Sequence, residues 1–121
     1  MNIETALKEA MTIEGALGAS LVDYESGMSL GSVGGGNVLD LEVASAGNTE
    51  VVRAKIRTLA SLKIDDSIED ILITLTRQYH LIRLLDRGGS QLFLYLALDR
   101  GRANLAMARH SLRRIEGELS I

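Results

Sequence analysis

The most strongly patterned stretch of the chain is an unbroken apolar run near its C-terminal end, Leu-Phe-Leu-Tyr-Leu-Ala-Leu at residues 92–98. A strand with one solvent-facing side alternates apolar and polar residues, and this run does not alternate. A strand that is apolar on both sides needs cover on both sides, so we expect it in the middle of a sheet that is packed between helices. The remaining elements should supply that cover.

Four further strands are predicted from short apolar or alternating stretches, at residues 17–24, 28–33, 68–76 and 79–85. Residues 23–27 end in a glycine and predict a hairpin turn between the first two strands. Asp-Arg-Gly-Gly-Ser at residues 86–90 predicts a second hairpin that leads into the central strand. The strand at 68–76 has Ile71 and Ile73 on one face and a more polar opposite face, so we predict an edge strand.

Three helices are predicted from apolar residues at helical spacing, at residues 3–14, 41–62 and 101–118, with Asn2, Asp40 and Asp99 as their N-caps. Three glycines at residues 34–36 should connect the first hairpin to the long second helix, because the lysine and hydroxyl residues of a phosphate-binding loop do not follow them. The order of elements predicts one α+β domain over residues 1–121, built on a five-stranded antiparallel sheet.

The long second helix carries two non-polar stripes. The bulky stripe, which should face the sheet, contains Leu41, Val52, Ile56 and Leu59. The other stripe repeats mostly small residues at spacings of three and four, and its members are Ala44, Gly47, Val51, Ala54 and Thr58. Small side chains let a second helix approach closely, so this stripe is a candidate dimer seam. The alternative is that alanine is simply a good helix former and the stripe faces only sheet or solvent.

Composition narrows the class of protein. The chain has no cysteine, which excludes disulfides, thiolate metal sites and cysteine nucleophiles. The N-terminal segment is amphipathic and contains acids, and no 18 apolar residues run together, so we expect neither a signal peptide nor a membrane span. A cytoplasmic protein is the resulting expectation.

Charge is unevenly distributed along the chain. Residues 1–76 carry 5 basic and 12 acidic groups, whereas residues 77–121 carry 8 basic and 4 acidic groups. The arginines of the predicted last helix are Arg102, Arg109, Arg113 and Arg114. They indicate either a solvated helix face or an anionic partner. Aromatic residues make up only 3% of the chain and none lie among these arginines, which argues against nucleic acid.

No catalytic constellation is visible. His80 lies on a predicted strand and His110 on the last helix, and neither has the spacing of a metal ligand to another histidine. The acid pairs at 65–66 and 69–70 are explained by a turn and a strand entry. We therefore expect a protein that is not an enzyme and that holds no cofactor or metal.

One local pattern resembles a known family. Ile-Glu-Gly-Ala-Leu-Gly-Ala-Ser-Leu-Val-Asp at residues 13–23, followed by Ser-Gly-Met at 26–28, is similar to the opening of Roadblock/LC7 domains, the family of dynein light-chain and bacterial gliding-protein relatives. The element order fits the same family over nearly the whole chain. The resemblance implies a profilin-like architecture with sheet order 2-1-5-4-3, helices 1 and 3 on one face and helix 2 on the other.

The resemblance also implies how the chain would assemble. Family members usually form dimers by pairing the second helix with its counterpart and the third strand with its counterpart. On this chain these elements are the small-residue stripe, from Ala44 to Thr58, and the edge strand with Ile71 and Ile73. A homodimer through these two elements is therefore expected.

The function implied by the resemblance is that of a non-catalytic homodimeric regulator or scaffold. It would bind a Ras-like small GTPase and modulate its nucleotide state or location, at most as an activating partner without catalytic residues of its own. Glu50, Arg53 and Arg57 project from the remaining side of the second helix and are the candidate partner contacts. Two alternatives stay open: a binder of anionic surfaces or nucleic acid through the basic last helix, and a small-ligand-sensing domain.

Overall fold

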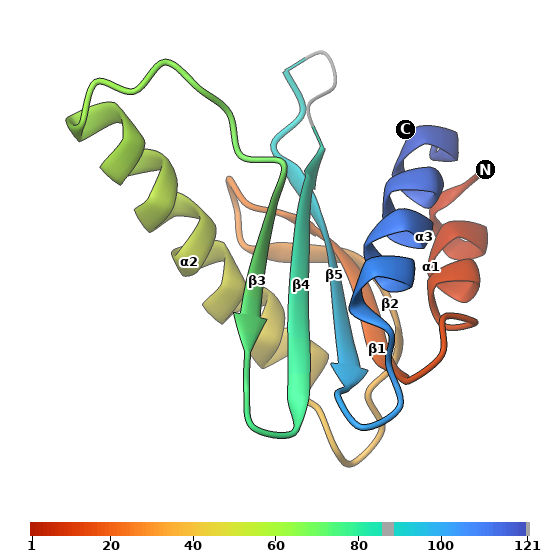
Figure 1. The fold of residues 1–121 in the computed structure, drawn as a ribbon. Coiled ribbons are helices and arrows are strands. Elements are labelled where there is room, and N and C mark those ends of the chain that lie inside the picture. Colours follow the sequence, from red (N-terminus) through yellow and green to blue (C-terminus); the bar gives the residue numbers. More distant parts are fainter. Residues whose placement is uncertain (86–88, 121) are drawn as a thin grey trace.

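A computed structural model of the chain describes residues 1–85 and 89–120, and in these residues it contains three helices and a five-stranded antiparallel sheet (Figure 1). In chain order the elements are α1 (Ile3–Ala10), β1 (Ala16–Asp23), β2 (Met28–Gly34), α2 (Leu41–Ser61), β3 (Asp70–Thr74), β4 (Gln78–Leu85), β5 (Leu92–Asp99) and α3 (Leu105–Glu118). The centre of the second predicted hairpin, residues 86–88, lies outside the described residues. The predicted α+β class is confirmed.

The sheet has the order β2-β1-β5-β4-β3, and every neighbouring pair is antiparallel. Strand β5 is therefore central, as its composition predicted. Its residues 93–98 are all buried, with Leu94, Leu96 and Leu98 in the core on one face and Phe93 and Tyr95 in the core on the other. Burial on both faces explains why this strand does not alternate.

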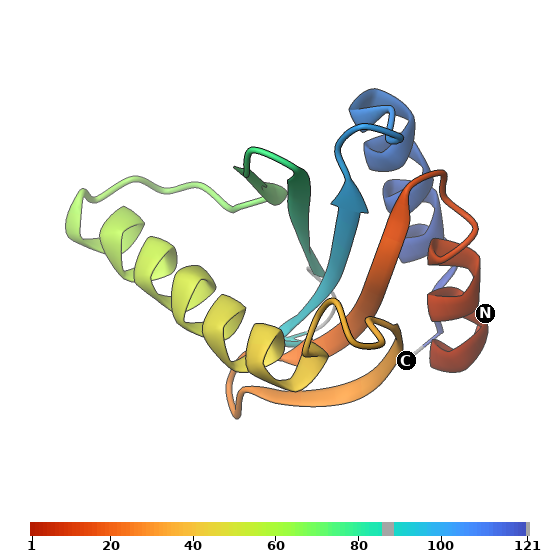
Figure 2. The same cartoon turned by 90° about the horizontal axis from the view of Figure 1, so that it is seen from below.

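Helices α1 and α3 cover one face of the sheet, and α2 lies on the opposite face (Figures 1 and 2). The core under α1 and α3 contains Leu7, Leu21, Leu81, Leu112 and Ile115. The core under α2 is smaller and is centred on Val22, Val52, Ile82, Phe93 and Tyr95. Figure 2 shows α2 close to β1 and β2 at its N-terminal end and progressively farther from the sheet toward its C-terminal end.

Two helix boundaries differ from the predictions. Helix α1 ends at Ala10 and not at residue 14, because Thr12 bonds back to the Glu9 carbonyl through both its amide and its hydroxyl. The predicted Asp99 cap is wrong: Asp99 still pairs within the sheet, and its carboxylate accepts from the Gly101 amide at 3.1 Å. Asn104 caps α3 instead, accepting from the Met107 amide at 3.1 Å.

The entry to α2 agrees with the sequence. Asp40 caps the helix by accepting from the amides of Glu42 and Val43 at 3.1 and 3.2 Å. The preceding glycines, residues 34–36, all have positive φ, and a Cβ on Gly35 would lie 2.5 Å from the Leu39 carbonyl oxygen. The triplet is therefore a tight turn that requires glycine, which confirms its predicted role as a connection. Strand β3 is shorter than the predicted 68–76 but does lie at the sheet edge.

Candidate dimer and partner surfaces on helix α2

The side of α2 that faces the sheet is unexpectedly polar. Its buried residues are Leu41, Ser45, Asn48, Thr49 and Val52. The Ser45 hydroxyl donates to the Leu41 carbonyl and the Thr49 hydroxyl to the Ser45 carbonyl, both at 2.7 Å. These bonds along the helix satisfy the hydroxyls without a partner from the sheet. The N-terminal half of α2 can therefore lie close to the sheet on small side chains.

The bulky stripe is only partly buried. Val52 is fully buried and Leu41 nearly so, as predicted, but Ile56 is 38% exposed and Leu59 is half-buried. The prediction that Ile56 and Leu59 pack in the core under α2 is wrong. The C-terminal half of α2 diverges from the sheet (Figure 2), and Ile56 and Leu59 line a pocket there.

The small-residue stripe is accessible along most of its length. Gly47, Val51, Ala54 and Thr58 are exposed, while Ala44 is half-buried against the core under α2. The Thr58 hydroxyl donates to the Ala54 carbonyl at 2.8 Å, so the stripe presents little polar surface of its own. A second helix would meet mostly glycine, alanine and methyl groups here.

Strand β3 forms one edge of the sheet. Ile71 and Ile73 are half-buried on the α2 side of the sheet and stand opposite Ile82 and His80 of β4. Within the described residues β3 pairs only with β4, so its other edge has no strand beside it. Such an edge is a template for pairing with another strand.

The three candidate partner contacts are not equivalent. Arg53 donates from Nε to the Tyr24 carbonyl at 2.8 Å and from Nη2 to the Glu25 carbonyl, and its Nη1 lies 3.7 Å from Glu50 Oε1. Arg53 thus fastens α2 to the turn between β1 and β2. Arg57 and Glu50 are exposed and point outward from the helix.

A polar cluster that the sequence did not reveal lies between α2 and the sheet. The Tyr95 hydroxyl is 3.2 Å from His80 Nδ1, and His80 Nε2 is 2.7 Å from Gln78 Oε1. Burial raises the pKa of Tyr95 to about 12 and lowers the pKa of His80. Both side chains are therefore neutral at neutral pH.

The same cluster borders the small-residue stripe. Asn48, His80 and Tyr95 line a 330 Å³ groove together with Ala44 and Gly47. Asn48 is 8% exposed, and its Nδ2 has no hydrogen-bond partner in the part of the chain that the structure describes. Its spacings of seven residues from Leu41 and four from Val52 are the sequence signals that it shares the sheet-facing side.

Ion pairs occupy part of the basic last helix. Arg109 lies 3.1 Å from Asp70 of β3, and Arg114 lies 3.2 Å from Glu9 and 3.4 Å from Glu118. These contacts tie α3 to β3 and α1, and they leave Arg102 and Arg113 as the exposed arginines of the predicted patch that make no ion pair with a described residue. The predicted patch therefore offers an anionic partner two arginines without an ion pair to a described residue, and not the four that the sequence predicted.

The described residues contain neither a metal site nor a membrane-spanning helix. No group of three or more His, Asp or Glu side chains among them is arranged to hold a metal ion. Among the same residues, no helix combines the length and apolar character needed to span a membrane.

Comparison with known proteins places the fold. No family model and no curated protein matches the chain. A Roadblock/LC7 domain from Streptomyces avermitilis superposes with a TM-score of 0.81 at 11% identity, covering 98% of this chain and 94% of that one. Myxococcus xanthus MglB gives 0.73 at 19% identity, covering 94% and 85%. MglC from the same organism gives 0.62 at 22% identity, covering 98% and 96%. With the order β2-β1-β5-β4-β3 and helices on both faces, this chain has the Roadblock/LC7 fold.

Proposed function

We propose that the chain is a non-catalytic regulator or scaffold that forms a homodimer through α2 and β3 and binds a Ras-like small GTPase in the cytoplasm. The observation that carries this proposal is the exposed small-residue stripe of α2 together with the edge strand β3, whose outer edge pairs with no strand among the described residues, in a chain with the Roadblock/LC7 fold. A gliding protein, MglB, from Thermus thermophilus has a similar fold.

The geometry of α2 supports a helix-to-helix contact. With 21 residues the helix is about 30 Å long, which is long enough for several turns of contact. Gly47 and Ala54 would allow two helix axes to approach to about 8 Å, the close end of the usual range. Val43 and Val51, which are 67% and 37% exposed, would be buried beside them. Pairing of β3 with its counterpart would extend the sheet across the dimer.

The GTPase would bind a different side of α2. Glu50 and Arg57 are exposed, and Arg53 holds the β1–β2 turn beside them. We assign Glu50 and Arg57 to partner contacts and Arg53 to positioning that turn. Paired helices can stabilise a GTPase switch region and so orient the catalytic groups of the GTPase itself, which requires no arginine finger from this chain.

Binding to GTPases tests the proposal. Each Ras-like GTPase from the same genome, loaded with GDP or with a non-hydrolysable GTP analogue, is passed over immobilised wild type, Arg57→Glu and the control Arg113→Glu. We expect one GTPase to bind with a preference for one nucleotide, and Arg57→Glu to weaken it at least about tenfold, whereas Arg113→Glu leaves it unchanged. Absence of binding in both nucleotide states, or equal binding by Arg57→Glu and wild type, would refute the proposal.

A further inference from the structure

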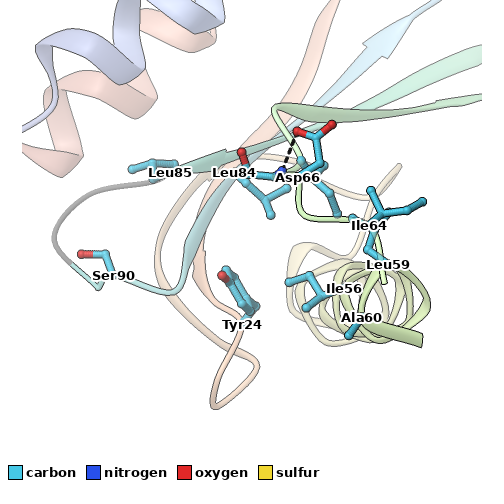
Figure 3. A pocket seen from close by; sticks show the side chains of 11 residues that line it. Tyr24, Ile56, Leu59, Ala60, Ile64, Asp66, Leu84, Leu85 and Ser90 are labelled. Atoms are coloured by element: carbon cyan, nitrogen blue, oxygen red, sulfur yellow. Dashed lines mark hydrogen bonds between the residues drawn. The ribbon is translucent and has the colours of Figure 1, made fainter. Parts of the chain in front are cut away.

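A mostly apolar pocket of 350 Å³ lies between the C-terminal half of α2 and the ends of β1 and β4 (Figure 3). Ile56, Leu59 and Ile64 line it from α2 and the segment that follows, Tyr24 lines it from the turn after β1, and Leu84 lines it from β4. Ile56 and Ile64 are 38% and 46% exposed, so much of this apolar surface is in contact with water.

The pocket exists because α2 leaves the sheet while its sequence remains apolar. Val52 is the last fully buried side chain of the helix, and Ile56 follows one turn later above the gap. Ala60, also on the pocket wall, is too small to fill the space. An apolar group that enters the pocket would remove this surface from water, which is the main favourable term in most protein association.

The rim of the pocket is acidic. The segment between α2 and β3 contains Asp65, Asp66 and Glu69, all of them exposed. None of the three forms an ion pair with a described residue, in contrast to Asp70, which lies 3.1 Å from Arg109. Asp66 lines the pocket directly, and its Oδ1 accepts from the Ser67 amide at 2.8 Å (Figure 3). Lys63 is the basic residue of this segment.

We propose that this pocket binds an apolar side chain from a basic segment of a partner protein. A volume of 350 Å³ is at the small end of ligand pockets, which span roughly 300–1,000 Å³, and suits one or two bulky side chains. Lysine or arginine residues on either side of the apolar anchor would face Asp65, Asp66 and Glu69. The acidic rim repels phosphate-bearing partners, so charge complementarity selects a basic protein segment.

This site is separate from the dimer seam. Ala54 and Thr58 are two residues before and after Ile56, and two helical residues differ by about 200° in direction, so they point away from the pocket. Occupation of the pocket therefore does not require the homodimer, and the proposal goes beyond the function given above. Failure of either proposal leaves the other testable.

The test uses a phage-displayed library of random nine-residue peptides, selected on the 121-residue chain. Selected peptides are then synthesised with a fluorescein label, and their affinity is measured by fluorescence anisotropy. Ala60→Trp fills the pocket from an exposed helix position, and Ala46→Trp makes the same change at an exposed position of α2 that does not line the pocket. The triple variant Asp65→Lys/Asp66→Lys/Glu69→Lys reverses the charge of the rim.

We expect selected peptides to carry one or two adjacent bulky apolar residues flanked by lysine or arginine. Ala60→Trp should weaken binding at least about tenfold, and Ala46→Trp should leave it unchanged. The rim reversal should weaken binding about tenfold and reverse the sign of its salt dependence, because a basic rim repels a basic peptide. Circular dichroism verifies that each variant is folded. If Ala60→Trp is unfolded, Ile56→Ala replaces it, because this change deletes part of the pocket wall at an exposed position.

Three results would overturn the proposal. Selected peptides without a lysine or arginine bias would remove the role of the rim. Unchanged affinity in Ala60→Trp would place the binding site elsewhere. Conversion of a wild-type dimer to a monomer by Ala60→Trp, measured by light scattering, would assign the pocket to a second copy of this chain.

Discussion

Arg53 should be a structural side chain of α2, and its removal tests how the helix is held. Its guanidinium donates to the carbonyls of Tyr24 and Glu25, 29 and 28 residues away in the chain. Arg53→Ala deletes both bonds and leaves two carbonyls without their donor. The C-terminal half of α2 has few buried side chains beyond Val52, so this clamp is one of its main attachments.

The size of the effect follows from the charge and the exposure of the clamp. A hydrogen bond to a charged group contributes about 1.5–3 kcal/mol when buried. The Arg53 side chain is 38% exposed, so water can replace part of the lost bonding, and we expect a total loss of about 1.5 kcal/mol. The contact with Glu50 at 3.7 Å adds little, because exposed pairs of this kind contribute about 0.3–0.5 kcal/mol.

Urea denaturation at fixed protein concentration measures this loss. With m-values of about 1–3 kcal/mol per molar urea, the midpoint should fall by roughly 0.5–1.5 M. The matched variant is Arg57→Ala, one turn farther along the helix and exposed, which should change the free energy of unfolding by less than about 0.5 kcal/mol. Equal midpoints for Arg53→Ala and Arg57→Ala would refute the clamp.

Three further predictions concern the core, a helix cap and pH. Leu96→Ala in the centre of β5 should lower the free energy of unfolding by about 2–5 kcal/mol in the same urea assay, and a loss below 1 kcal/mol would contradict the two-sided burial of that strand. Asn104→Ala should lower the free energy of unfolding by about 1 kcal/mol because it removes the α3 cap, and this loss should exceed that of Asp99→Ala. A larger loss in Asp99→Ala would show that Asp99 is the cap. Burial lowers the pKa of His80 below its ordinary value of 6.5, so the unfolded chain binds more protons than the folded chain as the pH falls through 6.5. The contribution of His80 to the free energy of unfolding should therefore be fully present above that pH and decline on acidification toward the folded pKa. His80→Gln should reduce this decline between pH 7.5 and 5.5 more than the matched variant His110→Gln does.

Much of the fold could be predicted because the residue types of several elements match the places that these elements take in the structure. The run at residues 92–98 is apolar on both faces, which only a central strand explains, and the sheet order places β5 at the centre. The Asp40 cap and the glycine turn before α2 were also readable, because both are local features in which one residue type satisfies one backbone need.

The sheet-facing side of α2 was not predictable from apolar periodicity. Ser45, Asn48 and Thr49 are buried there, although polar side chains normally indicate a solvent-facing stripe. Their burial depends on a tertiary condition, the close approach of the helix to the sheet. Ile56 is apolar and has the spacing of the buried stripe, which predicts a place in the core. The apolar pattern does not reveal where α2 diverges from the twisted sheet, so it cannot show that Ile56 lies beyond that point.

The candidate site was predictable in outline only. The small-residue stripe and the β3 edge were visible as patterns, and the structure leaves most of the stripe exposed. The role of Arg53 could not be read, because its partners are backbone carbonyls nearly thirty residues away. The acid-rimmed pocket likewise depends on the divergence of α2, and in the sequence its aspartates fit an ordinary turn.

The homodimer through α2 is the central claim, and solution molar mass tests it most directly. Light scattering on the wild type should give about twice 13.1 kDa, and Ala54→Glu, which puts a charge in the middle of the stripe, should give a folded monomer of 13.1 kDa. The matched variant Ala46→Glu, at an exposed position of α2 outside the stripe, should remain a dimer. A monomeric wild type, or a dimer that Ala54→Glu leaves intact, would contradict the account.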